Sequence, residues 1–215
     1  MHTSVAIGEI FQGKSSPEKK DKIEEIRGKK YSLYFLFDGV FSLPNTSRAI
    51  AFALKWARTN YQKYEKNNSF DLAGMMWDIQ KQIKKSGLPE PHTAYAVAFV
   101  PQDIDKEAKL SWLGNMGVFG VAKKELISLN QKKDNQVKLL GSEMTKKGDF
   151  REAILRNKSN GILLTSDGFA DFLNGRTKDF VKIFNQQKLM VVKAAVTRFV
   201  KNRTFQDATY IYIRR

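Results

Sequence analysis

The amino-acid sequence predicts an α+β fold in which antiparallel sheets are covered by pairs of helices. Three observations carry this prediction. Strand-like apolar runs and helical patterns come in separate blocks, the helical patterns follow one another in pairs, and the strand-like runs in the middle of the chain are joined by short polar turns. No internal repeat or linker divides the sequence, so we expect a single domain over residues 1–215.

The first predicted elements are two strands. The segment SVAIGEIFQ at 4–12 has the composition of a strand, and the strongly apolar segment at 31–37 predicts a second, fully buried one. Between them, residues 13–30 are polar and predict a loop in which one short helix would fit.

A pair of helices is predicted next. Asn45, Thr46 or Ser47 can cap the first helix, whose apolar side chains recur at steps of three and four residues. The second helix is expected to begin near Asp71 and to end at Gly87, with its apolar residues again on one side. Two successive helices of this kind are expected to pack on one face of a sheet.

The middle of the chain returns to strands. Runs at 93–100, 109–115 and 118–130 are separated by polar turns, which suits an antiparallel meander, and a further strand is expected at 161–166. These segments supply most of the predicted sheet.

A second helix pair and a closing strand are predicted at the end. We expect a short helix at 168–174, a longer one from about Asp179 to Asn202, and a strand over 208–215. Tyrosine and isoleucine alternate in that strand, so the two residue types should face opposite sides of the sheet.

Composition narrows the function classes. Cysteine is absent, which excludes a disulfide framework, a thiolate nucleophile and a cysteine-based zinc site, and fits a reducing cytoplasm. The chain opens without a signal-like segment, and no apolar run approaches the length of a membrane span. We therefore expect a soluble, cytoplasmic protein without membrane insertion.

The net charge of +15 would suit nucleic acid, an anionic surface or an acidic partner. The basic residues are scattered through loops without interleaved aromatics, and no nucleic-acid-binding motif is present, so we do not expect nucleic acid as the partner. A basic nucleic-acid or anionic-surface binding module stays open as an alternative.

Two apolar strands end in the same dipeptide. YSLYFLFDG ends at Asp38-Gly39, and NGILLTSDG ends at Asp167-Gly168. A carboxylate beside a closely approaching backbone at the tip of a buried strand is suited to holding a hard metal ion. Asp-Gly is also a common turn dipeptide, so either copy alone has a purely structural alternative. If the two strand ends meet in space, we expect them to form a metal site.

Five motifs in this order resemble the metal-dependent protein phosphatase 2C family. They are Asp38-Gly39 before a long helix, Thr93-Ala94 opening a strand, Gly114 inside a hairpin, Ser166-Asp167-Gly168 after GILLT, and an Asp-Ala-Thr run into the last strand. The resemblance covers nearly the whole chain. It implies a four-layer α/β/β/α sandwich of two antiparallel sheets flanked by helix pairs, which agrees with the element order derived above.

The resemblance also implies an activity, the dephosphorylation of phosphoserine and phosphothreonine at a binuclear Mg²⁺ or Mn²⁺ site. Asp38 would supply a bridging carboxylate, Gly39 a backbone carbonyl, and Asp167 a further carboxylate. Water held between two metals loses a proton more readily and attacks phosphorus in line. The catalytic residues implied for this chain are therefore Asp38 and Asp167.

The sequence departs from this family's pattern beside the first and central motifs. The family continues its first motif as Asp-Gly-apolar-Gly-Gly, whereas Val40 is followed here by Phe41-Ser42. Asn115 stands where the family has an acidic residue in its central hairpin, so one negative charge near the site is lost.

The last motif and the upstream region depart as well. Aligned on Thr209, the family's final ligand position is Gln206, and Asp207 would miss the site unless a bulge re-aims it. Upstream, Asp21 could stand for one of the family's aspartates. The family's phosphate-gripping arginine has no clear match, and Lys14 is a poor substitute because it cannot form a bidentate fork.

These departures favour a weakly active or inactive phosphatase-like protein that acts on or binds phosphoserine and phosphothreonine proteins, or binds a kinase. Its basic surface would recognise acidic segments. We expect Mn²⁺ or Mg²⁺ as the cofactor, lost or reduced to one ion, with Asp38, Gly39 and Asp167 as ligands completed by Asp21 or Asp207. An active metal-dependent serine/threonine phosphatase is the main alternative.

Overall fold

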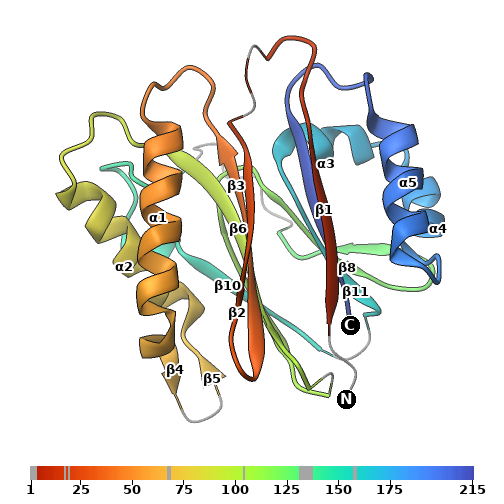
Figure 1. Cartoon of the computed structure of the whole chain (residues 1–215), viewed down its shortest axis with the longest axis horizontal. Helices are drawn as coiled ribbons and strands as arrows, with labels where there is room; N and C mark the ends of the chain where they lie inside the picture. The colour runs from red at the N-terminus through yellow and green to blue at the C-terminus, as the bar shows by residue number, and fades with distance from the viewer. Residues whose placement is uncertain are drawn as a thin grey trace.

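Two five-stranded antiparallel sheets face each other in the structure, which is a computed structural model (Figure 1). It describes residues 4–16, 18, 20–66, 69–103, 105–130, 138–156 and 159–215. In spatial order, the first sheet contains β1 (Val5–Phe11), β12 (Ala208–Arg214), β11 (Gly161–Thr165), β8 (Gly117–Val121) and β9 (Leu126–Ser128). The second contains β10 (Arg151–Leu155), β7 (Ala108–Leu113), β6 (Thr93–Pro101), β3 (Tyr31–Gly39) and β2 (Lys22–Arg27).

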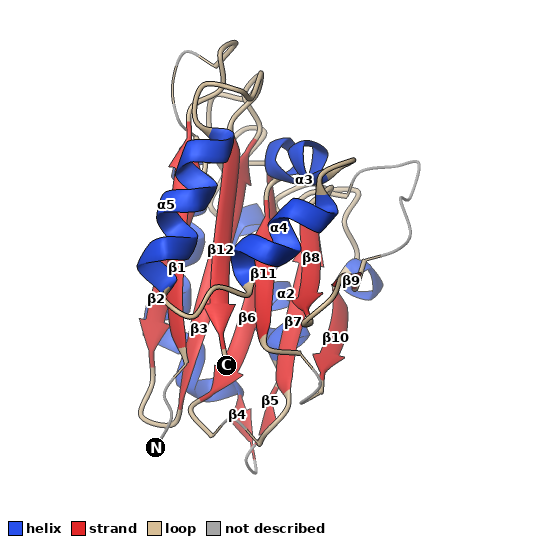
Figure 2. Cartoon of the chain, turned by 90° about the vertical axis from the view of Figure 1, so that its right-hand side faces the viewer, coloured by secondary structure: helices blue, strands red, loops and turns tan. Residues whose placement is uncertain are grey.

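Helices cover the outer faces of both sheets (Figures 1 and 2). Two helices lie on the second sheet, α1 (Thr46–Asn60) and α2 (Leu72–Lys85). Three helices lie on the first sheet, α3 (Asp167–Leu173), α4 (Thr177–Phe184) and α5 (Leu189–Val200). The predicted four-layer α/β/β/α sandwich of two antiparallel sheets is therefore confirmed.

The hydrophobic core forms three layers, one between the sheets and one under each set of helices. The closing strand shows how the sequence encodes this. Ile211 and Ile213 of β12 pack between the sheets, whereas Tyr210 and Tyr212 pack under the helices. The alternation read from the sequence thus places the two residue types on opposite faces, as predicted.

The first helix pair begins close to the predicted positions. Asp71 caps α2, because its side chain accepts a hydrogen bond from the Gly74 amide at 2.9 Å. Asn45 precedes α1 without a side-chain capping bond, and its amide instead donates to the Pro89 carbonyl at 2.8 Å. This bond ties the start of α1 to the segment that follows α2.

The predicted loop over residues 13–30 is partly wrong, because β2 lies within it. This strand pairs with β3 in a tight hairpin closed by a bond from the Gly28 amide to the Tyr31 carbonyl at 2.8 Å. It stands at the edge of its sheet, so only Ile26 of its residues is fully buried and its sequence is rich in charge. The edge strand β10 and the short ribbon of β4 (Glu65–Lys66) and β5 (Ser69–Phe70) were also not predicted.

The predicted meander is wrong at its centre. After β7 the chain leaves the second sheet, and β8 joins the first sheet between β11 and β9. Gly114, with φ of +92°, turns the chain at this crossing, and a Cβ there would lie 2.5 Å from the Ala94 Cβ. Gly114 and Asn115 therefore connect the two sheets rather than two paired strands.

The long helix predicted from Asp179 to Asn202 is two helices, α4 and α5. The break follows Asn185, whose side-chain amide donates to the Val181 carbonyl at 2.9 Å and to the Ala122 carbonyl at 3.0 Å. Asparagine competes for backbone acceptors in this way and favours helix ends. In the part of the chain that the structure describes, no helix is both long and apolar enough to cross a membrane.

The cap of α2 gives a first prediction. Asp71→Ala should lower the free energy of unfolding by about 1 kcal/mol, because the first turn of α2 loses its side-chain acceptor. Urea unfolding followed by circular dichroism measures the change. Asp71→Asn keeps an acceptor and should stay within a few tenths of a kcal/mol of wild type. An equal loss in both variants would show that the cap bond is not the cause.

Candidate functional site

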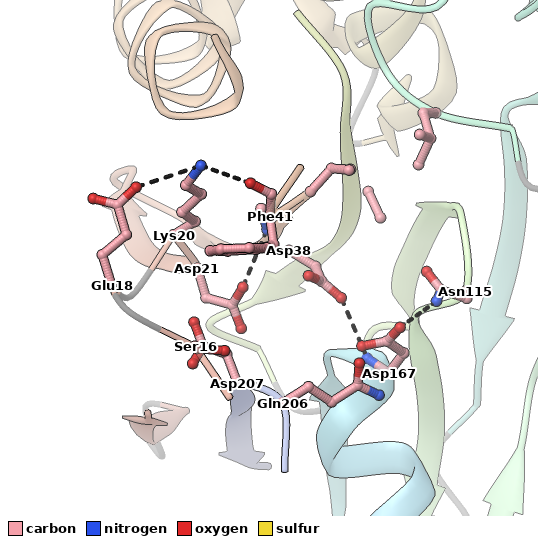
Figure 3. A pocket seen from close by; sticks show the side chains of 14 residues that line it. Ser16, Glu18, Lys20, Asp21, Asp38, Phe41, Asn115, Asp167, Gln206 and Asp207 are labelled. Carbon is pink, nitrogen blue, oxygen red and sulfur yellow. Dashed lines mark hydrogen bonds and ion pairs between the residues drawn. The ribbon is translucent and has the colours of Figure 1, made fainter. Parts of the chain in front are cut away.

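The two Asp-Gly strand ends meet at one end of the sandwich. Asp38, near the end of β3, accepts a hydrogen bond at Oδ2 from the backbone amide of Asp167 at 3.4 Å (Figure 3). Asp167 opens α3 directly after β11, so each sheet contributes one aspartate. Both line a cavity of about 310 Å³. The polar side chains that line the cavity with them include Lys20, Asp21, Asn115, Gln206 and Asp207.

Backbone contacts hold Asp38 at the cavity. Its carbonyl oxygen accepts a hydrogen bond from the Thr93 hydroxyl at 2.7 Å, and the next residue, Gly39, donates its amide to Asp21 Oδ1 at 3.1 Å. A Cβ on Gly39 would lie 2.4 Å from the Lys20 Cβ, so only glycine permits the chain to pass this closely. The glycine of the first motif therefore has a packing role.

The second Asp-Gly dipeptide is held against the start of β12. Ser166 and Thr209 exchange two hydrogen bonds, from the Ser166 amide to the Thr209 carbonyl at 3.0 Å and from the Thr209 amide to Ser166 Oγ at 2.9 Å. A Cβ on Gly168 would lie 2.1 Å from the Asp207 carbonyl oxygen. Glycine at this position lets α3 approach the segment that carries Gln206 and Asp207.

Asp21 lines the cavity, but both of its carboxylate oxygens accept hydrogen bonds from the protein. Oδ1 accepts from the Gly39 amide, and Oδ2 accepts from the Thr209 hydroxyl at 2.5 Å. The residue is only 6% exposed. Asp21 thus links β12 to the end of β3.

Gln206 and Asp207 both line the cavity, so Asp207 reaches the site region although regular strand alternation would have turned it away. The two residues precede β12, which begins at Ala208, so the alternation of a strand does not govern them. Asp207 Oδ1 accepts from the Gly13 amide at 2.9 Å. That bond directs the carboxylate toward the loop between β1 and β2.

Asn115 contacts Asp167 directly. Its side-chain amide donates a hydrogen bond to Asp167 Oδ2. The turn at Gly114 brings it there, and the side chain of Asn130 holds the same turn by donating to the Met116 carbonyl. One oxygen of Asp167 is therefore engaged by an amide.

Burial and mutual repulsion raise the pKa of two of these carboxyl groups. The carboxyl group of Asp38 is enclosed by the cavity walls, which raises its pKa well above the usual value, and the negative charges of Asp21 and Asp167 raise it further. Burial raises the pKa of Asp21 to about 6, although the bonds from Thr209 and Gly39 oppose this shift. The carboxyl groups of Asp38 and Asp21 therefore hold a proton more tightly than a solvent-exposed aspartate does.

Asp38 and Asp167 are the residues of the cavity that could hold a divalent cation. Asp38 and Asp167 converge, and Mg²⁺ commonly binds through one or two carboxylates while keeping several waters. Among the described residues, no three aspartate, glutamate or histidine side chains are grouped closely enough to hold a metal ion. Asp21 is occupied by two protein donors, so the donor set does not fit a binuclear centre as it stands.

Sequence reasoning missed the roles of two residues. Thr209 served only to align the last motif, yet its hydroxyl engages Asp21. Lys20 also lines the cavity, and among the described lining residues it is the only one with a positive charge. Its ammonium group donates to the Phe41 carbonyl at 2.9 Å and pairs with Glu18 at 3.4 Å. Lys14 does not line the cavity. No local sequence pattern marks these long-range contacts.

The raised pKa of Asp21 predicts a pH-dependent stability. The folded-state pKa of about 6 exceeds the unfolded value of 3.8, so the folded protein holds this proton more tightly. In metal-free protein, the resulting stabilisation is complete below about pH 4 and is lost as pH rises through about 6, by at most about 3 kcal/mol. Urea unfolding in the presence of a chelator between pH 4 and 7 measures this loss.

Two variants isolate the contribution of Asp21. Asp21→Asn removes one titrating group and should reduce the slope of the pH profile, with the part due to Asp38 remaining, whereas Asp171→Asn, at an exposed position on α3, should leave the slope unchanged. A profile for Asp21→Asn with the wild-type slope would contradict the assignment.

Comparison with known proteins identifies the fold. No protein-family model matches the chain, and no curated protein is similar to it in sequence. Solved structures are similar in shape. The serine/threonine phosphatase Stp1 from Staphylococcus aureus matches with a TM-score of 0.78 at 14% identity, covering 98% of this chain and 94% of that one.

Two further structures agree. A bacterial serine phosphatase matches with a TM-score of 0.78 at 14% identity, covering 97% of this chain and 96% of that one. RsbX, solved in complex with magnesium, matches with a TM-score of 0.72 at 11% identity, covering 100% of this chain and 96% of that one. Likeness at these identities establishes the fold alone. The chain therefore has the sandwich fold of bacterial serine/threonine phosphatases of the protein phosphatase 2C type.

Proposed function

We propose that this chain is a divergent phosphatase-fold protein that binds phosphoserine or phosphothreonine segments at the cavity and hydrolyses them weakly or not at all. The observation that supports the proposal is that most carboxylate oxygens of the aspartates in the cavity already accept hydrogen bonds from the protein. Asp38 and Asp167 converge, but Asn115 engages one oxygen of Asp167, and both oxygens of Asp21 accept hydrogen bonds from Gly39 and Thr209. A two-metal centre, which stabilises both the attacking and the leaving oxygen, needs more ligands than this pair offers.

The charge of the cavity makes one cation necessary for phosphate binding. Four aspartates line it, and an unneutralised acidic cavity would repel a phosphate group. A divalent ion held by Asp38 and Asp167 would offset that charge and polarise a phosphoryl oxygen. We infer that a single Mn²⁺ or Mg²⁺ ion serves recognition in this way.

The chain's own residues position these donors. The Thr93 hydroxyl fixes the backbone of Asp38, and Asp21 fixes Gly39. Among the described residues, no arginine lines the cavity, so the bidentate grip on phosphate that arginine provides is missing. Weak positioning of the phosphoryl group is a second reason to expect little hydrolysis.

An active metal-dependent serine/threonine phosphatase is the alternative function. The observation that favours it is that Asp38 and Asp167 both reach the cavity from the two sheets. A slow enzyme would need the same two aspartates.

Metal stoichiometry and turnover separate these functions. Calorimetric titration with Mn²⁺ should give about one bound ion per chain, and Asp38→Asn or Asp167→Asn should weaken binding tenfold or more, as loss of a charged ligand does. Hydrolysis of p-nitrophenyl phosphate with Mn²⁺ should stay near that of the Asp38→Asn, Asp167→Asn double variant. Two tightly bound ions together with clear Mn²⁺-dependent turnover would overturn the proposal in favour of the active enzyme.

Asn115 should control the metal affinity. Asn115→Asp replaces the amide donor with a third carboxylate beside Asp167 and should raise Mn²⁺ affinity by about tenfold or more. Asn115→Ala only frees the Asp167 oxygen and should raise affinity less, because the charge of the cavity is unchanged. Calorimetry and Mn²⁺-dependent melting shifts measure both variants, with Asn160→Ala as a distant control. Unchanged affinity in both would show that Asn115 does not limit metal binding.

A further inference from the structure

Two phenylalanine side chains stand exposed where three loops meet at the end of the sandwich that holds the cavity. Phe41, between β3 and α1, is 56% exposed and lines the cavity. Phe205, between α5 and β12, is 75% exposed and precedes Gln206, which also lines it. Figure 1 shows these two loops and the loop between β1 and β2 together at this end of the sheets.

The side chain of Lys20 holds the loop that carries Phe41 in place. The Lys20 ammonium donates to the Phe41 carbonyl at 2.9 Å and to the Leu43 carbonyl at 3.4 Å, and it lies 5.3 Å from the centre of the Phe41 ring. The Lys20 side chain is only 12% exposed. An aromatic ring is thus presented to solvent on a backbone whose position is already fixed.

The segment that carries Phe205 is held in a similar way by the loop between β1 and β2. The Phe205 carbonyl accepts hydrogen bonds from the Ser15 amide at 2.9 Å and the Ser15 hydroxyl at 2.6 Å. The Lys14 ammonium lies 5.8 Å from the centre of the Phe205 ring. A Cβ on Gly13 would lie 2.2 Å from the Gln206 carbonyl carbon, so the two segments are in close contact.

We propose that Phe41 and Phe205 anchor a peptide-binding surface at the cavity mouth, which selects phosphorylated segments with apolar side chains next to the phosphorylated residue. This inference rests on the proposed function, because the phosphorylated residue must enter the cavity. Exposed aromatic rings on fixed backbone are the side chains that dominate binding at protein interfaces, since little conformational entropy is lost when they are covered.

The charges at the mouth favour an acidic polypeptide as the occupant. The exposed ammonium group of Lys14 lies over the Phe205 ring, and the whole chain carries a net charge of +15. The ammonium group of Lys20 over the Phe41 ring, by contrast, is already paired with Glu18. A phosphorylated segment brings negative charge to this rim and apolar side chains to the rings. Flanking positions on both sides of the phosphorylated residue should contribute, because one phenylalanine lines the cavity and the other lies beside Gln206 on a different loop.

A peptide-binding experiment tests this inference. The probes are two fluorescein-labelled phosphothreonine peptides, one flanked by leucine and phenylalanine and one flanked by glycine and serine, each also made without phosphate. Fluorescence anisotropy in Mn²⁺ should show the apolar-flanked phosphopeptide binding about tenfold more tightly than its glycine/serine counterpart.

Substitutions in the full chain show which residues cause the preference for the apolar-flanked phosphopeptide. Phe41→Ala and Phe205→Ala should each remove most of the tenfold difference, and Phe41→Leu should retain most of it because an apolar contact remains. Met190→Ala, at a 72% exposed position on α5, is the matched control and should change nothing. Unchanged melting temperatures would show that the variants are folded, as expected for exposed side chains.

The outcomes distinguish this inference from the function on which it rests. Equal binding of the two phosphopeptides, or an undiminished difference in the Phe41→Ala, Phe205→Ala double variant, overturns the docking surface while leaving phosphate recognition intact. If phosphorylated and unphosphorylated peptides bind alike, or none binds, the proposed function fails and this inference fails with it.

Discussion

The site depends on the convergence of negative charge at the junction of the two sheets. Asp38 and Asp21 come from one side of the sandwich, and Asp167 and Asp207 from the other, and all four line one cavity. Burial and mutual repulsion would make such a group costly if every member were ionised. The structure offsets this cost with backbone amides that donate to Asp21, Asp38 and Asp207, and with the Thr209 hydroxyl, which donates to Asp21.

This solution also limits what the cavity can do. Each hydrogen bond that satisfies a carboxylate removes an oxygen lone pair from a bound ion, and the amide of Asn115 does so at Asp167. The contacts that stabilise the charge cluster in the absence of metal thus compete with metal binding. Under the proposed function, a site in which these hydrogen bonds prevail over metal binding would recognise phosphate without hydrolysing it.

Much of the fold could be predicted from local patterns, because they reflect burial on one face. The apolar stripes of α1 and α2 and the alternation in β12 were read correctly for this reason. The edge strands β2 and β10 were missed because each buries only one residue fully enough to mark a strand and both carry charged side chains. The division between α4 and α5 was missed because Asn185 bonds to the Ala122 carbonyl, which is distant in the sequence.

By itself the sequence determined which chemical groups are present: two Asp-Gly strand ends, an amide at position 115 and no cysteine. It also determined the order of the elements that form the sandwich. Only the tertiary structure decided that Asp207 lies at the cavity and that Asp21 is engaged by Thr209. It also decided which oxygens Asn115 and the backbone amides occupy. The physical reason is that these hydrogen bonds join residues from 18 to 194 positions apart, so they depend on how the strands and sheets pack, which no local pattern records.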